Sequence, residues 1–252
     1  MTEVADPRTL KAAILASPSY RLAHEDADLL AADDLRALRL QLELTKPERA
    51  LREHDIRSTV VVFGSARMSA SDPKGAHYLD EARRFAAMVS RRFQKEKRRD
   101  FVVVTGGGPG IMEAANLGAR EAGARSIGLN ITLPHEQEPN PFITPDLAFR
   151  FHYFAIRKMH FASRAKGMVA FPGGFGTMDE LFEILTLVQT GKMARIPIVL
   201  VGIDFWQRAI DFGFLVQEGM IAREDLDLFT MVETAEEAVN ALERFYGGRP
   251  PA

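Results

Sequence analysis

The chain has 252 residues, of which 46% are hydrophobic and 26% charged, and its formal net charge is −2 at pH 7. This composition suits one soluble α/β domain, and the near-neutral charge gives no general argument for nucleic-acid binding. The absence of cysteine excludes disulfides, zinc–thiolate sites and cysteine nucleophiles. The first residues form no convincing signal peptide, and no apolar run reaches the roughly 18 residues of a membrane span. We therefore expect a cytoplasmic protein without membrane contact.

Residues 1–56 differ in kind from the remainder of the chain. They are rich in leucine, alanine and charged residues at helical spacing, and they contain few β-branched residues. This pattern predicts an N-terminal helical arm of two or three helices, which packs on the body of the protein or on a second subunit. We expect a homo-oligomer. A basic run follows at residues 91–99, and we interpret it as a solvated helix end rather than a nucleic-acid patch.

Residues 57–248 alternate between short β-branched runs and amphipathic stretches. The predicted strands lie at residues 58–64, 100–106, 125–131, 167–173, 196–202 and 226–232. Runs that are apolar throughout are typical of parallel strands covered on both faces. The alternation predicts a Rossmann-like, doubly wound α/β fold with a mostly parallel sheet. We also expect an irregular loop at residues 133–145 and a helix over residues 151–166.

Three of the predicted strands end in small residues, in the sequences FGSAR, TGGGPGIME and PGGFGTMDE. The carboxyl ends of parallel strands share one edge of the sheet, where ligands bind. Glycine lets backbone amides approach a ligand, and amides at a helix N-terminus attract phosphate. The pattern G-x-G-x-x-G fails because Ile111 and Asp179 occupy its third glycine position, and the Walker pattern is absent too. The loops are therefore either an unusual phosphate site or tight turns without a ligand.

Helical spacing separates the two acids that follow the third loop. Asp179 shares a polar row with Glu183, which points it to water as a helix N-terminal charge. Glu180 shares an apolar row with Ile184, so it is either a buried capping group or a catalytic carboxylate or ribose ligand. The main apolar face is expected to comprise Met178, Leu181, Phe182, Leu185 and Val188.

An arginine among aromatic residues precedes this segment. Arg157 shares a helical row with Tyr153, Phe154, His160 and Phe161, so it either stacks in the core or reaches into a cleft. Spacing alone favours structural roles for Lys158 and His160. No serine lies in a G-x-S-x-G elbow, which argues against a Ser-His-Asp hydrolase.

The sequence PGGFGTMDE resembles the PGG-x-GT-x-x-E signature of the LOG (Lonely Guy) family, and the preceding Arg157–Lys158 pair matches a second element of that family. TGGGPGIMEAAN resembles its first phosphate-side loop, and two further segments resemble its longer bacterial subgroup. Where the short plant-type members carry Met-His-Glu, this chain has Phe154, Ala155 and Ile156.

The resemblance implies hydrolysis of the N-glycosidic bond of a nucleoside 5′-monophosphate, either AMP or an N6-modified AMP. It implies no metal and no cofactor. Its catalytic pair corresponds to Arg157 and Glu180. The expected substrate-binding residues are Ser65, Arg67, Gly107, Gly108, Glu113, Phe154, Lys158, Gly173, Gly174, Gly176 and Thr177. Glu113 and water are both candidates for the acid that protonates the leaving base.

Other functions remain open at this point. A nucleotide or molybdenum-cofactor carrier shares a PGG-x-GT-like loop, and only the Arg157–Glu180 pair favours the enzyme over it. A decarboxylase using pyridoxal phosphate needs a Schiff-base lysine, for which Lys158 and Lys166 have no recognisable context. A scaffold that assembles through the N-terminal helices would leave the glycine loops unexplained.

Overall fold

The chain forms two compact units, Met1–Thr45 and Lys46–Ala252. The structure is a computed structural model, and it describes residues 6–95, 98–132, 138–249 and 251. The division falls before the predicted boundary after residue 56, and the domain limits stay a prediction. Among the described residues, none of the helices has both the length and the apolar character needed to cross a bilayer.

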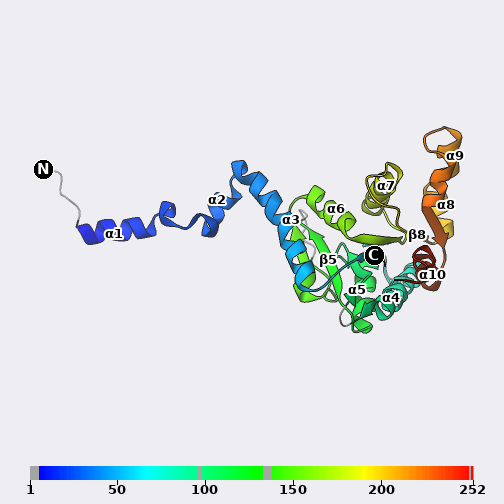
Figure 1. Cartoon of the computed structure of the whole chain (residues 1–252). Helices are drawn as coiled ribbons and strands as arrows, with labels where there is room; N and C mark the ends of the chain where they lie inside the picture. Colours follow the sequence, from blue (N-terminus) through cyan, green and yellow to red (C-terminus); the bar gives the residue numbers. More distant parts are fainter. Residues whose placement is uncertain (1–5, 96–97, 133–137, 250, 252) are drawn as a thin grey trace. The chain divides into compact units, whose positions relative to one another are not determined.

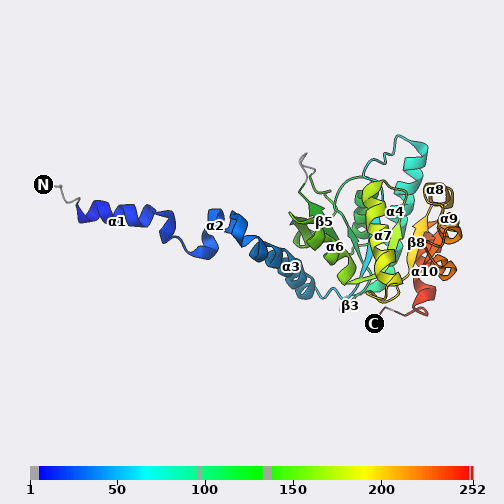
Figure 2. The ribbon, with the colours of Figure 1, turned by 90° about the horizontal axis from the view of Figure 1, so that it is seen from above.

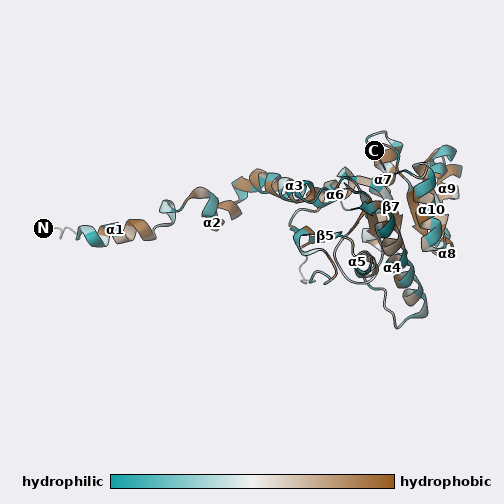
Figure 3. Cartoon of the chain, turned by 60° about the horizontal axis from the view of Figure 1, so that its bottom comes forward, coloured by the Kyte–Doolittle hydropathy of each residue, from teal (hydrophilic) through white to brown (hydrophobic). Residues whose placement is uncertain are grey.

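The N-terminal unit is helical. It contains α1 (Pro7–Ala16), α2 (Ala27–Ala31), the first part of α3 (Arg36–Glu53) and the short 3-10 turns η1 (Pro18–Tyr20), η2 (Ala23–Glu25) and η3 (Asp33–Leu35). Asp6 and Asp26 accept hydrogen bonds from first-turn amides of α1 and α2, which fixes where these helices begin. Within residues 6–45 no side chain is buried, and α1 is polar toward its N-terminus and apolar toward its C-terminus (Figure 3). Its packing partner and the homo-oligomer stay predictions.

The second unit is built on a sheet with helices around it (Figure 1). In the described part of the chain its seven strands lie in the order β6-β5-β4-β1-β7-β8-β9, and all neighbours are parallel. The strands are β1 (Thr59–Phe63), β4 (Val102–Thr105), β5 (Ser126–Ile131), β6 (Ala148–Phe151), β7 (Ala165–Ala170), β8 (Ile198–Val201) and β9 (Phe229–Val232). The Rossmann-like α/β prediction is confirmed.

Helices cover both faces of this sheet (Figure 2). The helices of this unit are α4 (Pro73–Phe93), α5 (Ile111–Glu121), α6 (Phe154–Ser163), α7 (Phe175–Gln189), α8 (Ile203–Ala209), α9 (Phe212–Gln217) and α10 (Ala235–Phe245), with the 3-10 turns η4 (Pro145–Leu147) and η5 (Arg223–Leu228). The alternating sides of β1 show the two layers. Val60 and Val62 join a core cluster with Phe85 of α4, whereas the Phe63 ring packs 4.8 Å from that of Phe161 in α6. Strands buried on both faces account for the uninterrupted apolar runs in the sequence.

Two local predictions are correct only in part. The helix expected over residues 151–166 is confined to α6, because Phe151 pairs with Ile131 as the end of β6 and Ala165 pairs with Thr59 as the start of β7. The basic run begins as the predicted solvated helix end, with Arg91 and Arg92 exposed in the last turn of α4, but it continues into the antiparallel strand pair β2 (Gln94–Lys95) and β3 (Arg98–Arg99). Of the predicted 133–145 loop, residues 133–137 lie outside the described residues, and residues 138–144 are irregular.

The strand order reverses direction between β1 and β7. From β1 the chain builds outward through β4, β5 and β6, and it then returns to the other side of β1 to form β7, β8 and β9. In open α/β sheets, the crevice outside the carboxyl ends of the strands at such a switch point is where ligands bind.

Candidate active site

Backbone hydrogen bonds join the loops at the switch point. The amide of Ser65, just after β1, donates to the carbonyl of Pro172 at 3.0 Å, and the amide of Ile111 donates to the carbonyl of Ser65 at 3.2 Å. The β1, β4 and β7 loops therefore meet at one place, as their common position at the sheet edge predicts. All three glycine-bearing sequences contribute to that place.

A cavity of about 730 Å³ opens between these loops and α6. Its volume is in the range of small-molecule sites. Its lining among the described residues comprises Phe63, Gly64, Ser65, Ala66, Arg67, Gly106, Gly108, Met112, Asn130, Ile131, Phe154, Arg157, Phe161, Gly173, Gly174, Phe175, Gly176, Thr177, Met178 and Glu180. The lining combines apolar rings with a few polar groups.

The glycines of the third loop have different physical roles. A Cβ on Gly173 would lie 2.1 Å from the Thr177 hydroxyl, so packing within the loop requires glycine there. At Gly174 and Gly176 a Cβ would meet nothing within 4 Å, and neither residue has a positive φ. The fold itself does not require glycine at these two positions. They leave open space on the cavity side of the N-terminus of α7, where backbone amides can approach an anion.

A buried polar network supports the second glycine loop. The Thr105 hydroxyl donates to Asn116 Oδ1 at 2.8 Å and accepts from the Gly107 amide at 3.0 Å. Asn140 Nδ2 donates to the same Asn116 oxygen and to the Gly108 carbonyl, each at 3.0 Å. These hydrogen bonds join the Gly107 amide and the Gly108 carbonyl to buried side chains of neighbouring segments. The network therefore holds the Gly107–Gly108 backbone in one position.

Arg157 of α6 and Glu180 of α7 meet at the wall of the cavity. Arg157 Nη2 lies 3.6 Å from Glu180 Oε1, and the two side chains are 14% and 5% exposed. The guanidinium carbon lies 4.9 Å from the ring centroid of Phe154 and 5.7 Å from that of Phe161. Within the described residues, Arg157 Nε and Glu180 Oε1 have no hydrogen-bond partner. Buried polar atoms without partners are exceptions in folded proteins, and they mark this pair as a candidate for a functional rather than a purely structural role.

Burial dominates the ionisation of both groups. It raises the pKa of the Glu180 carboxyl to about 7, an effect that the positive charges of Arg157 and Lys158 only partly offset. Burial also lowers the pKa of the Arg157 guanidinium, against the opposing attraction of Glu180. A carboxyl group with a pKa near neutrality can gain and lose a proton under ordinary conditions, as general acid–base chemistry requires.

The structure brings together most of the predicted site residues. Ser65, Arg67, Gly108, Phe154, Arg157, Gly173, Gly174, Gly176, Thr177 and Glu180 all line the cavity. Gly107, Glu113 and Lys158 are not among its described lining residues, and their contact with substrate stays a prediction. Gly107 has a φ of +74° and is buried, and a Cβ there would lie 2.5 Å from the Asn130 side chain, so its glycine serves the loop itself.

Lys158 points away from the cavity toward the exposed side of α7. Its Nζ lies 2.8 Å from Asp179 Oδ1 and 3.3 Å from Glu183 Oε2. Asp179 is exposed, as its helical row predicts, and it pairs with Lys158. Glu180 is buried, also as predicted, but Phe182 is 41% exposed and does not belong to the buried face of α7. The side chains that do form that face are Thr177, Glu180, Leu181, Ile184, Leu185 and Val188.

Several lining residues carry no motif that sequence reasoning could have used. Asn130, near the end of β5, offers an amide donor and acceptor to the cavity, and Met112 in the first turn of α5 offers an apolar surface. The one available signal for Asn130 is its place as a polar residue at the carboxyl end of a predicted strand. Among the described residues, no group of three or more histidine, aspartate or glutamate side chains is placed to hold a metal ion.

The chain matches a known protein family. A family model described as "Possible lysine decarboxylase" matches residues 112–242, slightly more than half of the chain. The chain belongs to this family, the LOG family. The resemblance read from the two motifs is thereby confirmed.

Curated LOG-family relatives carry names that describe an activity. The chain is 30% identical over 148 residues to the cytokinin riboside 5′-monophosphate phosphoribohydrolase LOG of Oryza sativa subsp. japonica, covering 57% of this chain and 60% of that protein. It is 28% identical over 153 residues to LOG3 of Arabidopsis thaliana, which carries the same activity name, covering 58% of this chain and 69% of that protein. The chain thus spans about three fifths of the length of the rice relative.

Solved structures share the fold at lower identity. The molybdenum cofactor carrier protein of Chlamydomonas reinhardtii superposes with a TM-score of 0.52 at 19% identity, covering 76% of this chain and 99% of that chain. The protein TM1055 superposes with a TM-score of 0.50 at 20% identity, covering 74% of this chain and 99% of that chain. At these identities the likeness concerns the fold alone.

Proposed function

We propose that the protein hydrolyses the N-glycosidic bond of a nucleoside 5′-monophosphate, releasing the free base and ribose 5-phosphate. The substrate is AMP or an N6-modified AMP such as a cytokinin riboside monophosphate. The observation that carries the proposal is the buried Arg157–Glu180 pair, 3.6 Å apart at the wall of a cavity that also holds the glycine loops. Relatives named phosphoribohydrolases support the same reaction class.

The substrate phosphate is assigned to the glycine loops. Gly174 and Gly176 leave space beside the N-terminus of α7, whose amides favour an anion, and the Thr177 hydroxyl lies next to them. Gly108 and Ser65 line the same cavity from the neighbouring loops. Anchoring the phosphate supplies binding energy away from the bond that breaks, which can promote the chemistry at the sugar.

Glu180 is assigned the central role at the ribose. Breaking a ribosyl–base bond builds positive charge on the sugar, and an adjacent carboxylate stabilises that charge. With a pKa near 7, Glu180 can also accept a proton from the attacking water. Arg157 stays protonated, so we assign it to orienting Glu180 and the ribose hydroxyls and to balancing charge.

The leaving base lies against the apolar part of the cavity in this proposal. Phe154 is half exposed at the cavity and offers an aromatic face to a planar ring, and Arg67 lines the same cavity. Glu113 is not among the described lining residues, which leaves water as the remaining candidate to protonate the base. Lys158 is paired with two carboxylates, an unsuitable state for a Schiff-base lysine in a decarboxylase.

An assay of purified full-length chain with AMP, N6-prenylated AMP and adenosine tests this function. Chromatography is expected to show adenine and ribose 5-phosphate formed in equal amounts from AMP. Adenosine, which lacks the phosphate, is expected to react far more slowly. Binding of both nucleotides without any base release would overturn the proposal in favour of a nucleotide or cofactor carrier.

A further inference from the structure

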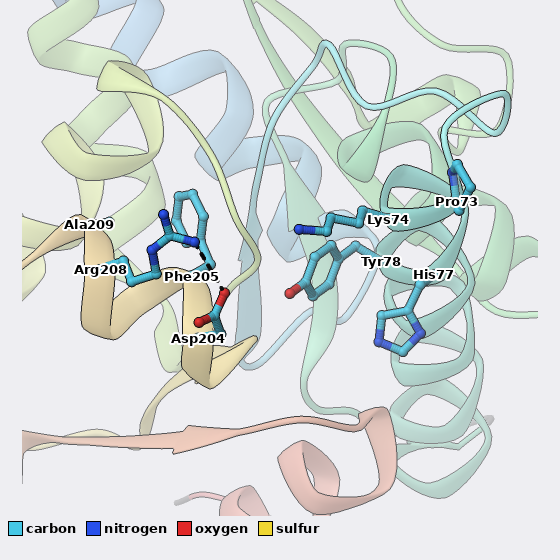
Figure 4. A pocket seen from close by; sticks show the side chains of 8 residues that line it. All are labelled: Pro73, Lys74, His77, Tyr78, Asp204, Phe205, Arg208 and Ala209. Carbon is cyan, nitrogen blue, oxygen red and sulfur yellow. Dashed lines mark ion pairs between the residues drawn. The ribbon is translucent and has the colours of Figure 1, made fainter.

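A second cavity, of about 680 Å³, lies between the first turns of α4 and helix α8 (Figure 4). Its lining consists of Pro73, Lys74, His77, Tyr78, Asp204, Phe205, Arg208 and Ala209. None of these residues lines the candidate active site. Because α4 and α8 follow β1 and β8, this cavity also lies at the carboxyl edge of the sheet, where ligand sites of this fold class occur.

The unused polar groups of this cavity are donors. Within the described residues, the Lys74 ammonium and the Tyr78 hydroxyl have no hydrogen-bond or ion-pair partner, and both point into the gap between the helices (Figure 4). The acidic groups are already engaged. Asp204 lies 3.7 Å from Arg208, and Glu233 accepts the Ile203 amide at 2.9 Å. A ligand with acceptor oxygens can satisfy these two donors.

The formal charges around the cavity balance, because Lys74 and Arg208 are cationic whereas Asp204 and Glu233 are anionic. Arg208 already faces Asp204, so Lys74 is the cation that an anionic ligand can use. Burial raises the pKa of the Tyr78 hydroxyl, and the Glu233 and Asp204 carboxylates add to this effect. Tyr78 thus stays protonated and able to donate in any neutral buffer.

Two aromatic rings form the apolar part of the cavity. Tyr78 comes from α4 and Phe205 from α8. The glycine at position 202 makes the placement of Tyr78 possible, because it has a φ of +96° and a Cβ there would lie 2.6 Å from the Tyr78 hydroxyl. Rings of this kind suit the planar part of an organic ligand.

The helix N-termini themselves do not supply the site. The Asp72 carboxylate accepts the Gly75 amide at 2.9 Å and caps α4, and Glu233 occupies the first amide of α8. Recognition of an anion in this cavity therefore depends on side chains, Lys74 first among them.

We propose that this cavity is a second binding site, which takes a phosphorylated aromatic compound of about mononucleotide size. Its phosphate binds the Lys74 ammonium and accepts from the Tyr78 hydroxyl, and its ring lies against Phe205. The proposal does not depend on the function proposed above. The segment between β1 and α4 lines the candidate active site at Ser65 and Arg67 and leads into Pro73, the first residue of α4, which lines the second cavity, so the two sites must be measured separately.

Calorimetric titration of the full-length Glu180→Gln chain with AMP tests this site. We expect two equivalents of AMP per chain. Adding Lys74→Ala is expected to weaken one of the two sites by roughly tenfold or more, the effect of losing a hydrogen bond from a charged group. Tyr78→Phe, which removes only the hydroxyl, should weaken the same site less. Lys192→Ala, which removes an exposed lysine elsewhere, is the matched control and should leave both sites unchanged.

The outcomes separate the two proposals. A single equivalent that Lys74→Ala and Tyr78→Phe leave unchanged would overturn the second site while retaining the candidate active site. A single equivalent that Lys74→Ala removes would support the second site and count against nucleotide binding at the candidate active site. Binding of two equivalents of AMP whose affinities are both unchanged by Lys74→Ala would also overturn the assignment of the second site.

Discussion

Arg157 Nη2 lies 3.6 Å from Glu180 Oε1, and both side chains are withdrawn from solvent at the wall of one cavity. Two opposing effects act on this pair. Burial disfavours both charges, whereas each charge favours the other, and for Glu180 burial is the larger effect. The result is a carboxyl group whose protonation changes near neutral pH, and this property has measurable consequences.

The rate of base release is expected to rise with pH on the acidic side. If the ionised carboxylate of Glu180 is the active form, kcat/KM for AMP should increase through an apparent pKa of about 7 and then level off. The measurement is a pH–rate profile from pH 5 to pH 9 at constant ionic strength. A profile that is flat over this range, or one that falls from pH 6 to pH 8, would contradict the assigned role.

Removing the cation should shift that profile. In Arg157→Ala the carboxyl of Glu180 stays buried but loses its largest stabilising charge, so its pKa should rise and the acidic limb should shift to higher pH. The titration of the substrate phosphate is unaffected by this change, which makes the shift specific to the enzyme. Arg120→Ala, at an exposed position in α5, is the matched control. An unchanged limb with a uniformly lower rate would mean that Arg157 acts on the substrate alone.

Stability should depend on the same carboxyl group. The native state keeps the Glu180 proton up to about pH 7, whereas the unfolded chain loses it near the ordinary value of 4.5. This group therefore stabilises the fold fully below about pH 4.5, and its contribution is lost as the pH rises through 7. The change is on the order of 3 kcal/mol in the free energy of unfolding.

Urea unfolding at pH 5 and pH 8 measures that linkage. Glu180→Gln, which carries no charge at either pH, should gain stability relative to the wild-type chain between pH 5 and pH 8. Glu236→Gln removes an exposed carboxylate in α10 and should show the wild-type pH dependence. Equal pH dependence in Glu180→Gln and the wild-type chain would show that the carboxyl pKa is not raised in the folded state.

The glycines of the third loop can be separated by their roles. Gly173→Ala brings a methyl group 2.1 Å from the Thr177 hydroxyl and should destabilise the fold by roughly 1–3 kcal/mol. Gly174→Ala meets no atom within 4 Å, so thermal stability should be unchanged or slightly raised, while AMP affinity should fall. Thermal melts and AMP titrations of both variants test this. Unchanged AMP affinity in Gly174→Ala would remove the phosphate from this part of the loop.

The central strands were predictable because burial on both faces leaves an uninterrupted apolar run. All five residues of β1 are buried, and the uninterrupted apolar run VVVF predicts this burial. β6 was not predictable in the same way. It is a four-residue edge strand with alternating exposed and buried side chains, and aromatic residues that also suit a helix follow it. The β2–β3 hairpin consists of charged and amide residues without strand propensity.

In the candidate site, too, helical spacing predicts some features, whereas others depend on how the elements pack together. The helical row of Glu180 predicted its burial, because neighbours one turn away are apolar. Spacing could not predict the direction of Lys158, since that depends on where α7 places Asp179 and Glu183 beside α6. Asn130 is separated from the motifs in sequence, and the pairing of β5 with β4 brings it to the cavity.

Parallel assays of AMP binding and adenine release, in the wild-type chain and in Glu180→Gln, test the central claim most directly. We predict that the wild-type chain releases adenine and ribose 5-phosphate, and that Glu180→Gln binds AMP but reacts at least ~100-fold more slowly. Glu236→Gln, at an exposed position in α10, should retain the wild-type rate. Equal rates of adenine release in Glu180→Gln and the wild-type chain would contradict the assignment of Glu180 as the catalytic carboxylate.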